Sequence, residues 1–330
     1  MYAVVLHDNP RELRVESRPE PSPGPGQAVI ASRVVGICRS DIELINGTLD
    51  DWLDVRYPLV FGHEWSGEVV AIGKDVTRIK VGDRVTGCGA LGNDRWFGVT
   101  DNGASAERFT VDASLLQRLP FSMSYEQGAL IEPFACVYHG LTAIGGVDPS
   151  TNVCVLGAGT IGVFAAAAAR ACGAQVVVVE PNPLRHRVAL QMGASVAIET
   201  ATLEAVERAL GCGPDLVIEA AGASTALASS LEIVASGGRV LFLGLCSAER
   251  TLAALRLIQI KNLHMRGSTG APLAVWEPAI RFLTSATVDL APVISYRFGL
   301  NNIADAFAAA RDPAHLKVQI HLGGGYDARQ

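Results

Sequence analysis

The run Cys154-Val155-Leu156-Gly157-Ala158-Gly159-Thr160-Ile161-Gly162 is the feature that most constrains the fold. Its glycines are spaced as G-x-G-x-x-G, after an apolar run and before an Ala-rich segment. In dinucleotide-binding units the first glycine permits a tight turn, the second lets the backbone approach a pyrophosphate, and the third lets a helix pack closely on a strand. We therefore predict a strand, a turn and a helix whose N-terminus faces the pyrophosphate. The predicted cofactor-binding residues of this turn are Gly157, Gly159, Thr160, Ile161 and Gly162.

An acidic residue follows the glycines at the distance expected for a ribose-binding carboxylate. Glu180 ends the apolar run Val176–Val179, about twenty residues after the glycines. A carboxylate there binds both hydroxyls of an adenosine ribose and repels a 2′-phosphate, so the pattern favours NAD over NADP. Arg185 either stacks on the adenine, which is compatible with NAD, or accepts a 2′-phosphate, and the sequence leaves both roles open.

The hydrophobic pattern changes near residue 150. Before it, short apolar runs alternate with turn signals, which is typical of a β-rich domain. After it, apolar strand runs alternate with helical segments, which is typical of a doubly wound parallel sheet. Beyond about residue 290 the pattern is mixed again, so this tail is expected to return to the first domain. The runs expected as parallel strands are Val153–Leu156, Gln175–Glu180, Leu216–Ala220 and Arg239–Leu243.

The bulk properties exclude several classes of protein. A chain of 330 residues exceeds the usual size of one domain, so we expect two. The net charge of −6, without a basic block, argues against a nucleic-acid partner. No signal peptide or membrane-length apolar run is visible, so we expect a cytoplasmic protein without a membrane partner. Seven scattered cysteines indicate reduced thiols.

A second motif pair contains metal-binding residue types. Cys38 in GICRSD and His63 in GHE both follow apolar runs, at predicted strand-to-loop junctions. Thiolate and neutral imidazole are preferred zinc ligands, and a catalytic zinc takes three protein ligands and keeps one position open. The third ligand is Glu64 or Glu132, and both alternatives remain; Glu132 is flanked by apolar residues, where a carboxylate is costly to bury. Asp41 is a candidate acceptor for the spare imidazole N–H of His63.

Zinc together with a nicotinamide dinucleotide suggests hydride transfer between an alcohol and a carbonyl. The motifs GICRSD, GHEWSGEV, VGDRV, the Glu132–Pro133 pair, VLGAGTIG and KVQI, in this order, resemble the zinc-dependent medium-chain dehydrogenases, which include alcohol, sorbitol and threonine dehydrogenases. The resemblance runs nearly end to end. It implies an α/β fold with a GroES-like β-rich catalytic domain, residues 1–148 and 292–330, and a Rossmann dinucleotide-binding domain with a doubly wound parallel sheet, residues 149–291.

The resemblance also implies roles for single residues. Cys38 and His63 match zinc ligands, and Glu132 stands where the polyol branch has an acid and the alcohol branch a cysteine. Glu64 matches the acid that exchanges with water on zinc, and Ser40 matches the hydroxyl that passes the substrate proton onward. Arg39 and Lys317 match cations on the cofactor pyrophosphate, and Glu43 stands near the place of a relay histidine in the alcohol branch.

The chain departs from the family in its structural-zinc lobe. Between Val85 and Phe109 it has one cysteine, Cys88, whereas a structural site needs four ligands. We therefore expect one catalytic Zn²⁺ per chain, NAD, and no structural zinc. The expected reaction is hydride transfer between NAD and a secondary alcohol or ketone, with a polyol, a sugar or an aminocyclitol as substrate (the 2-deoxy-scyllo-inosamine dehydrogenase-like branch), in a homodimer or homotetramer. The alternatives are a zinc-free NADPH-dependent quinone or enoyl reductase and a non-catalytic family member.

Overall fold

The computed structural model describes residues 1–246 and 250–323, which form two compact units. Unit 1 contains Met1–Glu132, Ala271–Pro278 and the chain from Ile294 onward, and unit 2 contains Pro133–Gly270 and Ala279–Val293. Both ends of the chain thus belong to one unit, which surrounds the other in sequence. Relative to the boundaries expected from the sequence, residues 133–148 and 292–293 lie in unit 2 and residues 271–278 lie in unit 1.

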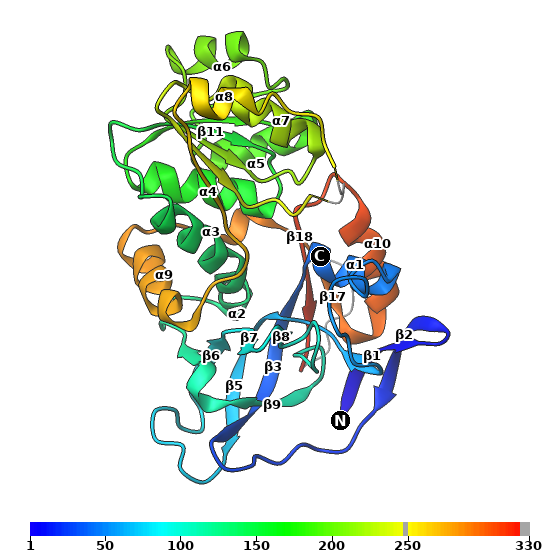
Figure 1. The fold of residues 1–330 in the computed structure, drawn as a ribbon. Coiled ribbons are helices and arrows are strands. Elements are labelled where there is room, and N and C mark those ends of the chain that lie inside the picture. Colours follow the sequence, from blue (N-terminus) through cyan, green and yellow to red (C-terminus); the bar gives the residue numbers. More distant parts are fainter. Residues whose placement is uncertain (247–249, 324–330) are drawn as a thin grey trace. The chain divides into compact units, whose positions relative to one another are not determined.

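Unit 1 is β-rich. Its largest sheet has seven strands, six of them in the order β10-β6-β5-β3-β18-β17, with β9 also paired to β3. Strand β18 lies between β3 and β17, so the last strand of the described residues completes a sheet begun by the first third of the sequence (Figure 1). The strands are β3 (Gln27–Ile37), β5 (Glu64–Ile72), β6 (Arg84–Gly87), β9 (Arg108–Asp112), β10 (Leu116–Arg118), β17 (Ile294–Gly299) and β18 (Lys317–His321).

Two smaller sheets complete the β structure of unit 1. One has the order β2-β1-β4, and the other is the pair β7-β8. Their strands are β1 (Tyr2–Asp8), β2 (Arg11–Ser17), β4 (Leu59–Val60), β7 (Ala90–Gly92) and β8 (Arg95–Trp96). The core beside the large sheet is aromatic: the ring of Trp65 meets Phe109 edge-on at 4.8 Å, and Phe97 packs against both. Rings in this arrangement bury much apolar surface and hold the start of β5 in place.

Unit 2 contains a parallel sheet of six strands in the order β13-β12-β11-β14-β15-β16. The strands are β11 (Asn152–Leu156), β12 (Gln175–Val179), β13 (Val196–Ile198), β14 (Leu216–Glu219), β15 (Arg239–Phe242) and β16 (His264–Gly267). The order reverses between β11 and β14, and ligands of such sheets bind beyond the carboxyl ends of the strands at that point. The predicted α/β class and the predicted parallel sheet are confirmed.

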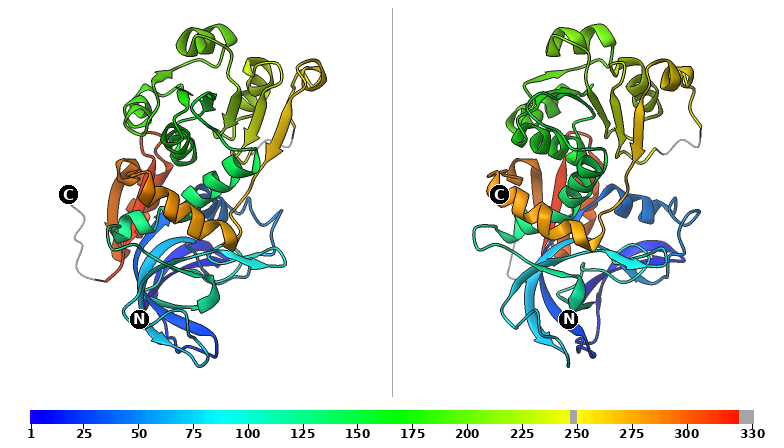
Figure 2. Two further views of the ribbon diagram at one scale, coloured as in Figure 1. Left: turned by 90° about the vertical axis from the view of Figure 1, so that its left-hand side faces the viewer. Right: turned by 60° about the vertical axis from the view of Figure 1, so that its left-hand side comes forward.

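Helices flank the strands of unit 2 (Figure 2). Helix α4 packs on β11 and β12, whereas α7 packs on β14 and β15. The helices are α4 (Thr160–Ala171), α5 (His186–Gln191), α6 (Leu203–Leu210), α7 (Ser224–Ile233) and α8 (Arg256–Ile260). Two more, α3 (Ile131–Ala143) and α9 (Leu273–Ser285), contain residues of both units. Among the described residues, no helix combines the length and the apolar character that crossing a membrane requires.

The glycine turn has the geometry that its sequence predicts. Gly157 has a φ of 100°, which disfavours other residues, and α4 begins three residues later at Thr160. A Cβ atom on Gly162 would lie 1.9 Å from the carbonyl oxygen of Gly157, so only glycine lets α4 start this close to β11. A Cβ atom on Gly159, by contrast, would meet none of the described atoms within 4 Å. The first and third glycines are therefore required by packing, and the second leaves space open.

We expect Gly162→Ala to lower the free energy of unfolding by about 1–3 kcal/mol, because the added methyl group forces α4 away from the glycine turn. Chemical denaturation monitored by circular dichroism measures this difference. Gly159→Ala is the matched control and should stay within about 0.5 kcal/mol of the parent chain. Equal stability of both variants would contradict this account of the turn.

Candidate active site

Cys38 stands where β3 ends and α1 (Arg39–Asn46) begins. It is the N-cap residue of that helix, and its backbone N–H donates to Asp41 Oδ2 at 2.7 Å. Asp41 therefore fixes the backbone from which the thiol projects. The positive end of the helix dipole is the position in a helix that best stabilises a thiolate. The sequence folds this way because an apolar strand ends at Ile37 and an acid follows within the first helical turn.

His63 lies between β4 and β5, and its ring has a different neighbour on each nitrogen. Nε2 is 3.5 Å from Ser40 Oγ, and Nδ1 is 3.7 Å from Asp41 Oδ1. Burial would lower the pKa of His63, but the carboxylate of Asp41, the thiol of Cys38 and the charge of Glu132 together raise it well above its ordinary value. Burial also raises the pKa of Asp41, to about 6, although the charge of His63 opposes the shift.

The ligand atoms of Cys38, His63 and Glu64 all lie within 4.8 Å of one another. A thiol, an imidazole and a carboxylate at this spacing form a donor set that Zn²⁺ prefers. His63 Nδ1 and Asp41 Oδ1 are buried and have no hydrogen-bond partner among the described residues, yet they face each other. This is the orientation in which a carboxylate steadies a zinc-bound histidine, so the residues present fit a zinc ion. The other acid of the predicted set, Glu132, lies in the first turn of α3.

Glu64 is held by a buried cation. Lys317 Nζ donates to Oε2 of Glu64 at 2.6 Å and to Oε1 at 2.8 Å, and also to the carbonyl of Ile37 at 3.1 Å. The side chains of Glu64 and Lys317 are 1% and 4% exposed, so water does not screen the pair. Burial would lower the pKa of Lys317, but Glu64, the largest opposing influence, keeps it above its ordinary value. Lys317, expected at a pyrophosphate, thus lies beside the metal-ligand set.

Arg39, the other expected pyrophosphate cation, is exposed. Its side chain is 76% exposed, and Nε donates to Glu43 at 3.3 Å, one helical turn along α1. Its exposure leaves it able to meet a ligand from solution, unlike Lys317. Glu43, whose own side chain is 16% exposed, is thereby tied to Arg39.

In unit 2 the acid that follows the glycines is part of the turn itself. Glu180 accepts hydrogen bonds from the backbone N–H of Ala158 at Oε2 (2.8 Å) and of Asn182 at Oε1 (2.9 Å). The Arg185 guanidinium lies 3.7 Å from Glu180 Oε2. Each carboxylate oxygen has more than one lone pair, so each keeps acceptor capacity for a further donor. The structure therefore brings Glu180, Arg185 and the glycine turn together, as the spacing predicts.

Two residues lie near Glu132 that the sequence reasoning did not connect with it. Cys88 is 2% exposed and its thiol is 3.5 Å from the carbonyl of Ala271, to which Trp276 Nε1 also donates at 3.3 Å. Burial raises the pKa of Cys88, and the charge of Glu132 adds to this shift. Cys88 and Trp276 therefore belong to the surroundings of that acid. They are far apart in the sequence and no motif connects them, so no local signal was available.

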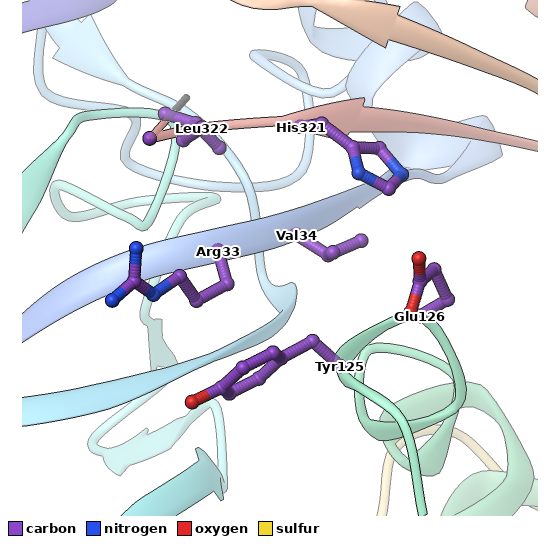
Figure 3. Close-up of a pocket in the computed structure, with 7 residues that line it drawn as sticks. Arg33, Val34, Tyr125, Glu126, His321 and Leu322 are labelled. Carbon is purple, nitrogen blue, oxygen red and sulfur yellow. The ribbon is translucent and has the colours of Figure 1, made fainter. Parts of the chain in front are cut away.

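A cavity of about 150 Å³ lies elsewhere in unit 1 (Figure 3). It forms around the last residue of β18 and helix α2 (Tyr125–Gly128), whereas Lys317 begins β18. In Figure 3 the carboxylate of Glu126 points toward the ring of His321. Burial lowers the pKa of His321 despite the charge of Glu126. This cavity is separate from the metal-ligand set and contains none of the predicted site residues; its lining is Arg33, Val34, Tyr125, Glu126, His321, Leu322 and Gly323.

Comparison with known proteins agrees with this geometry. Residues 24–121 match the model of the alcohol dehydrogenase GroES-like domain, and residues 160–285 match the zinc-binding dehydrogenase model. Sorbitol dehydrogenase of Ovis aries is 32% identical over 346 residues, covering 96% of this chain and 95% of that protein. The structure is similar to 2R,3R-butanediol dehydrogenase from Bacillus subtilis (TM-score 0.88, 25% identity, 98% and 99% of the chains covered). It is also similar to galactitol-1-phosphate dehydrogenase from Escherichia coli (TM-score 0.84, 26% identity, 97% and 100% covered). The predicted GroES-like and Rossmann-like fold class is confirmed.

We expect Lys317→Met to lower the free energy of unfolding by about 3–5 kcal/mol, because it leaves the carboxylate of Glu64 buried without its cation. The double variant Lys317→Met, Glu64→Gln removes both charges and should regain part of that loss. Equilibrium denaturation of the two single variants and the double variant gives the coupling energy. A coupling energy near zero would show that the ion pair does not support unit 1.

Proposed function

Because the chain belongs to the zinc-dependent medium-chain dehydrogenases, we propose that it transfers hydride between NAD and the secondary alcohol of a polyol, a sugar or an aminocyclitol, using one catalytic Zn²⁺. Membership makes it a dehydrogenase that acts on CH–OH donors. The observation that carries the proposal is the close set of Cys38, His63 and Glu64, where β3 ends and β5 begins, in a chain whose parallel sheet carries a dinucleotide turn.

The acid at position 132 supports a polyol-type substrate. Glu132 replaces the thiolate that the alcohol branch of the family has there, and it lies near enough to His63 for its charge to raise the pKa of the imidazole. The similar proteins point the same way, since their names give sorbitol, butanediol and galactitol phosphate as substrates. A substrate with neighbouring hydroxyl groups is therefore the class that we propose.

We propose that Cys38, His63 and Glu132 hold the zinc ion. Glu64 is a member of the same close set, but Lys317 binds both of its oxygens, so we assign it a supporting role. When bound, the zinc supplies Lewis acidity, which lowers the pKa of the substrate hydroxyl. Asp41 keeps the ring of His63 in the orientation and tautomer that ligation requires.

Ser40 carries the substrate proton away. Its hydroxyl is 3.5 Å from His63 Nε2, so it stands beside the ring nitrogen that belongs to the ligand set. The hydroxyl oxygen accepts the proton of the substrate while its own proton passes to solvent, so Ser40 ends each turnover unchanged. Its position in the first turn of α1 places it next to Cys38 without competing for the metal.

The dinucleotide supplies the hydride acceptor, and the residues of unit 2 hold it. The backbone N–H groups at the start of α4 face the pyrophosphate, and Gly159 leaves room for its approach. Glu180 is fixed by Ala158 and Asn182, so its carboxylate is already oriented for the hydroxyls of the adenosine ribose. Arg185, beside Glu180, stacks on the adenine.

We expect Cys38→Ser and His63→Ala to remove zinc and turnover while NADH affinity stays within about threefold of the parent chain, because the metal ligands lie outside unit 2. Elemental analysis should give about one zinc per parent chain. Cys212→Ser, which alters an exposed thiol, is the matched control and should keep both zinc and activity. Dehydrogenase activity in zinc-free Cys38→Ser would instead support the zinc-free reductase alternative. If the parent chain bound NADH but turned over no tested polyol, sugar or aminocyclitol, that result would support the non-catalytic alternative.

We expect Glu180→Ala to weaken NAD binding roughly tenfold, because a charge-assisted hydrogen bond to the ribose is lost. Affinity for NADP should fall less, since the carboxylate no longer repels its 2′-phosphate. Steady-state kinetics with each cofactor measures the change in preference. Glu199→Ala, at an exposed acid of the same unit, is the control. An unchanged preference would mean that Glu180 serves only to hold the turn.

A further inference from the structure

Glu219 is a fully buried acid that the proposed mechanism does not use. It is the last residue of β14, and its exposed fraction is 0%. Oε1 accepts hydrogen bonds from the backbone N–H of Ala221 (2.9 Å) and of Gly222 (2.8 Å). Its main-chain oxygen accepts from the N–H of Leu243 (2.8 Å) and of Gly244 (3.0 Å). One residue thus joins the loop after β14 to the loop after β15.

The second carboxylate oxygen of Glu219 is enclosed by the same two loops. Oε2 is buried without a hydrogen-bond partner among the described residues. A Cβ atom on Gly244 would lie 2.7 Å from Oε2 and 2.4 Å from the backbone nitrogen of Gly222, so glycine is needed for the loops to meet around the carboxyl group. Burying a polar oxygen without a hydrogen bond costs free energy. The presence of Glu219 despite this cost indicates that the hydrogen bonds accepted by Oε1 are important for the two loops.

Burial raises the pKa of Glu219, although the hydrogen bonds from Gly222 and Ala221 oppose the shift. A neutral carboxyl group still accepts at Oε1, so the connection between the loops does not depend on a negative charge. The hydrogen bonds that Oε1 accepts therefore join the loops in either protonation state.

The position of Glu219 in the sheet suggests which ligand group this geometry serves. In a doubly wound sheet a dinucleotide lies across the point where strand order reverses, with one mononucleotide half on each side. Glu180, at the end of β12, stands on the side proposed for the adenosine half. Glu219, at the end of β14, stands on the other side, where the nicotinamide half lies. A Cβ atom on Gly157 would be 3.0 Å from Ala221, so the loop held by Glu219 also borders the glycine turn.

We propose that Glu219 is a positioning residue for the nicotinamide half of the cofactor. By holding the loops after β14 and β15 together, it shapes the surface on which the nicotinamide and its ribose rest, and it touches neither of them. This inference rests on the proposed use of NAD. It predicts that loss of Glu219 weakens binding of the whole dinucleotide but not of its adenosine half.

The test compares the binding of NADH with that of AMP by isothermal titration calorimetry. In Glu219→Ala the Kd for NADH should rise about tenfold, the scale expected when two buried N–H groups lose their acceptor, whereas the Kd for AMP should stay within about twofold. In Glu219→Gln the amide oxygen keeps both backbone donors, so the Kd for NADH should stay within about threefold. The control is Glu204→Gln, which changes an acid whose side chain is 82% exposed.

Gly244→Ala tests the same contact from the other loop and keeps the proposal falsifiable if Glu219→Ala does not fold. Its methyl group pushes the loop after β15 off the carboxyl group, so NADH binding should again fall while AMP binding does not. Equal weakening of NADH and AMP in the folded variants, or no weakening of either, would overturn the proposal, and so would a Glu219→Gln variant as defective as Glu219→Ala. A parent chain that binds neither ligand would overturn the proposed cofactor instead.

Discussion

The buried ion pair between Lys317 and Glu64 is the interaction on which the site in unit 1 depends. It joins the first residue of β18 to the first residue of β5, and through the carbonyl of Ile37 it also reaches the end of β3. These strand ends are the ones that carry Cys38 and His63. A charge buried on one strand cannot leave its partner without a large cost in free energy, so the pair fixes how the C-terminal strand enters the sheet. The metal-ligand set is thereby built on three strands held at a common edge.

In unit 2, buried acids hold the loops in place by hydrogen bonds to backbone N–H groups. Two acids stand at the ends of β12 and β14, the strands on either side of β11. Each accepts hydrogen bonds from backbone N–H groups: Glu180 from Ala158 and Asn182, and Glu219 from Ala221 and Gly222. Carboxylates of this kind hold glycine-containing loops without adding bulk. The glycines allow the loop backbones to approach closely, and the hydrogen bonds to the acids restrict the conformational freedom that glycine would otherwise leave. A cofactor surface made largely of backbone is stable for that reason.

Much of this arrangement could be predicted from local sequence. The G-x-G-x-x-G spacing encodes sterics within a few residues, and the structure confirms that Gly162 has no room for a methyl group. The alternation of apolar runs likewise predicted the parallel sheet. Contacts between distant segments could not be predicted: nothing near Lys317 in sequence indicates that its partner is Glu64, and nothing near Cys88 points to Trp276. Residues 133–148 were expected in the first domain because the hydrophobic pattern changes near residue 150, but the continuous helix α3 contains residues of both units.

Glu64 and Glu132 both lie near His63, and the charges around this ring give the two acids different roles. Asp41 and Glu132 both raise the pKa of this imidazole, and Glu64 would add a third buried charge if Lys317 did not neutralise it. With the ion pair in place, Glu132 and Cys38 are the proposed anionic ligands, and Asp41 acts through the ring of His63. That balance suits a divalent cation with one neutral and two anionic ligands, because the net charge of the set then falls close to zero. In the proposed ligand set Glu132 binds the metal, whereas Glu64, paired with Lys317, supports the strands β5 and β18.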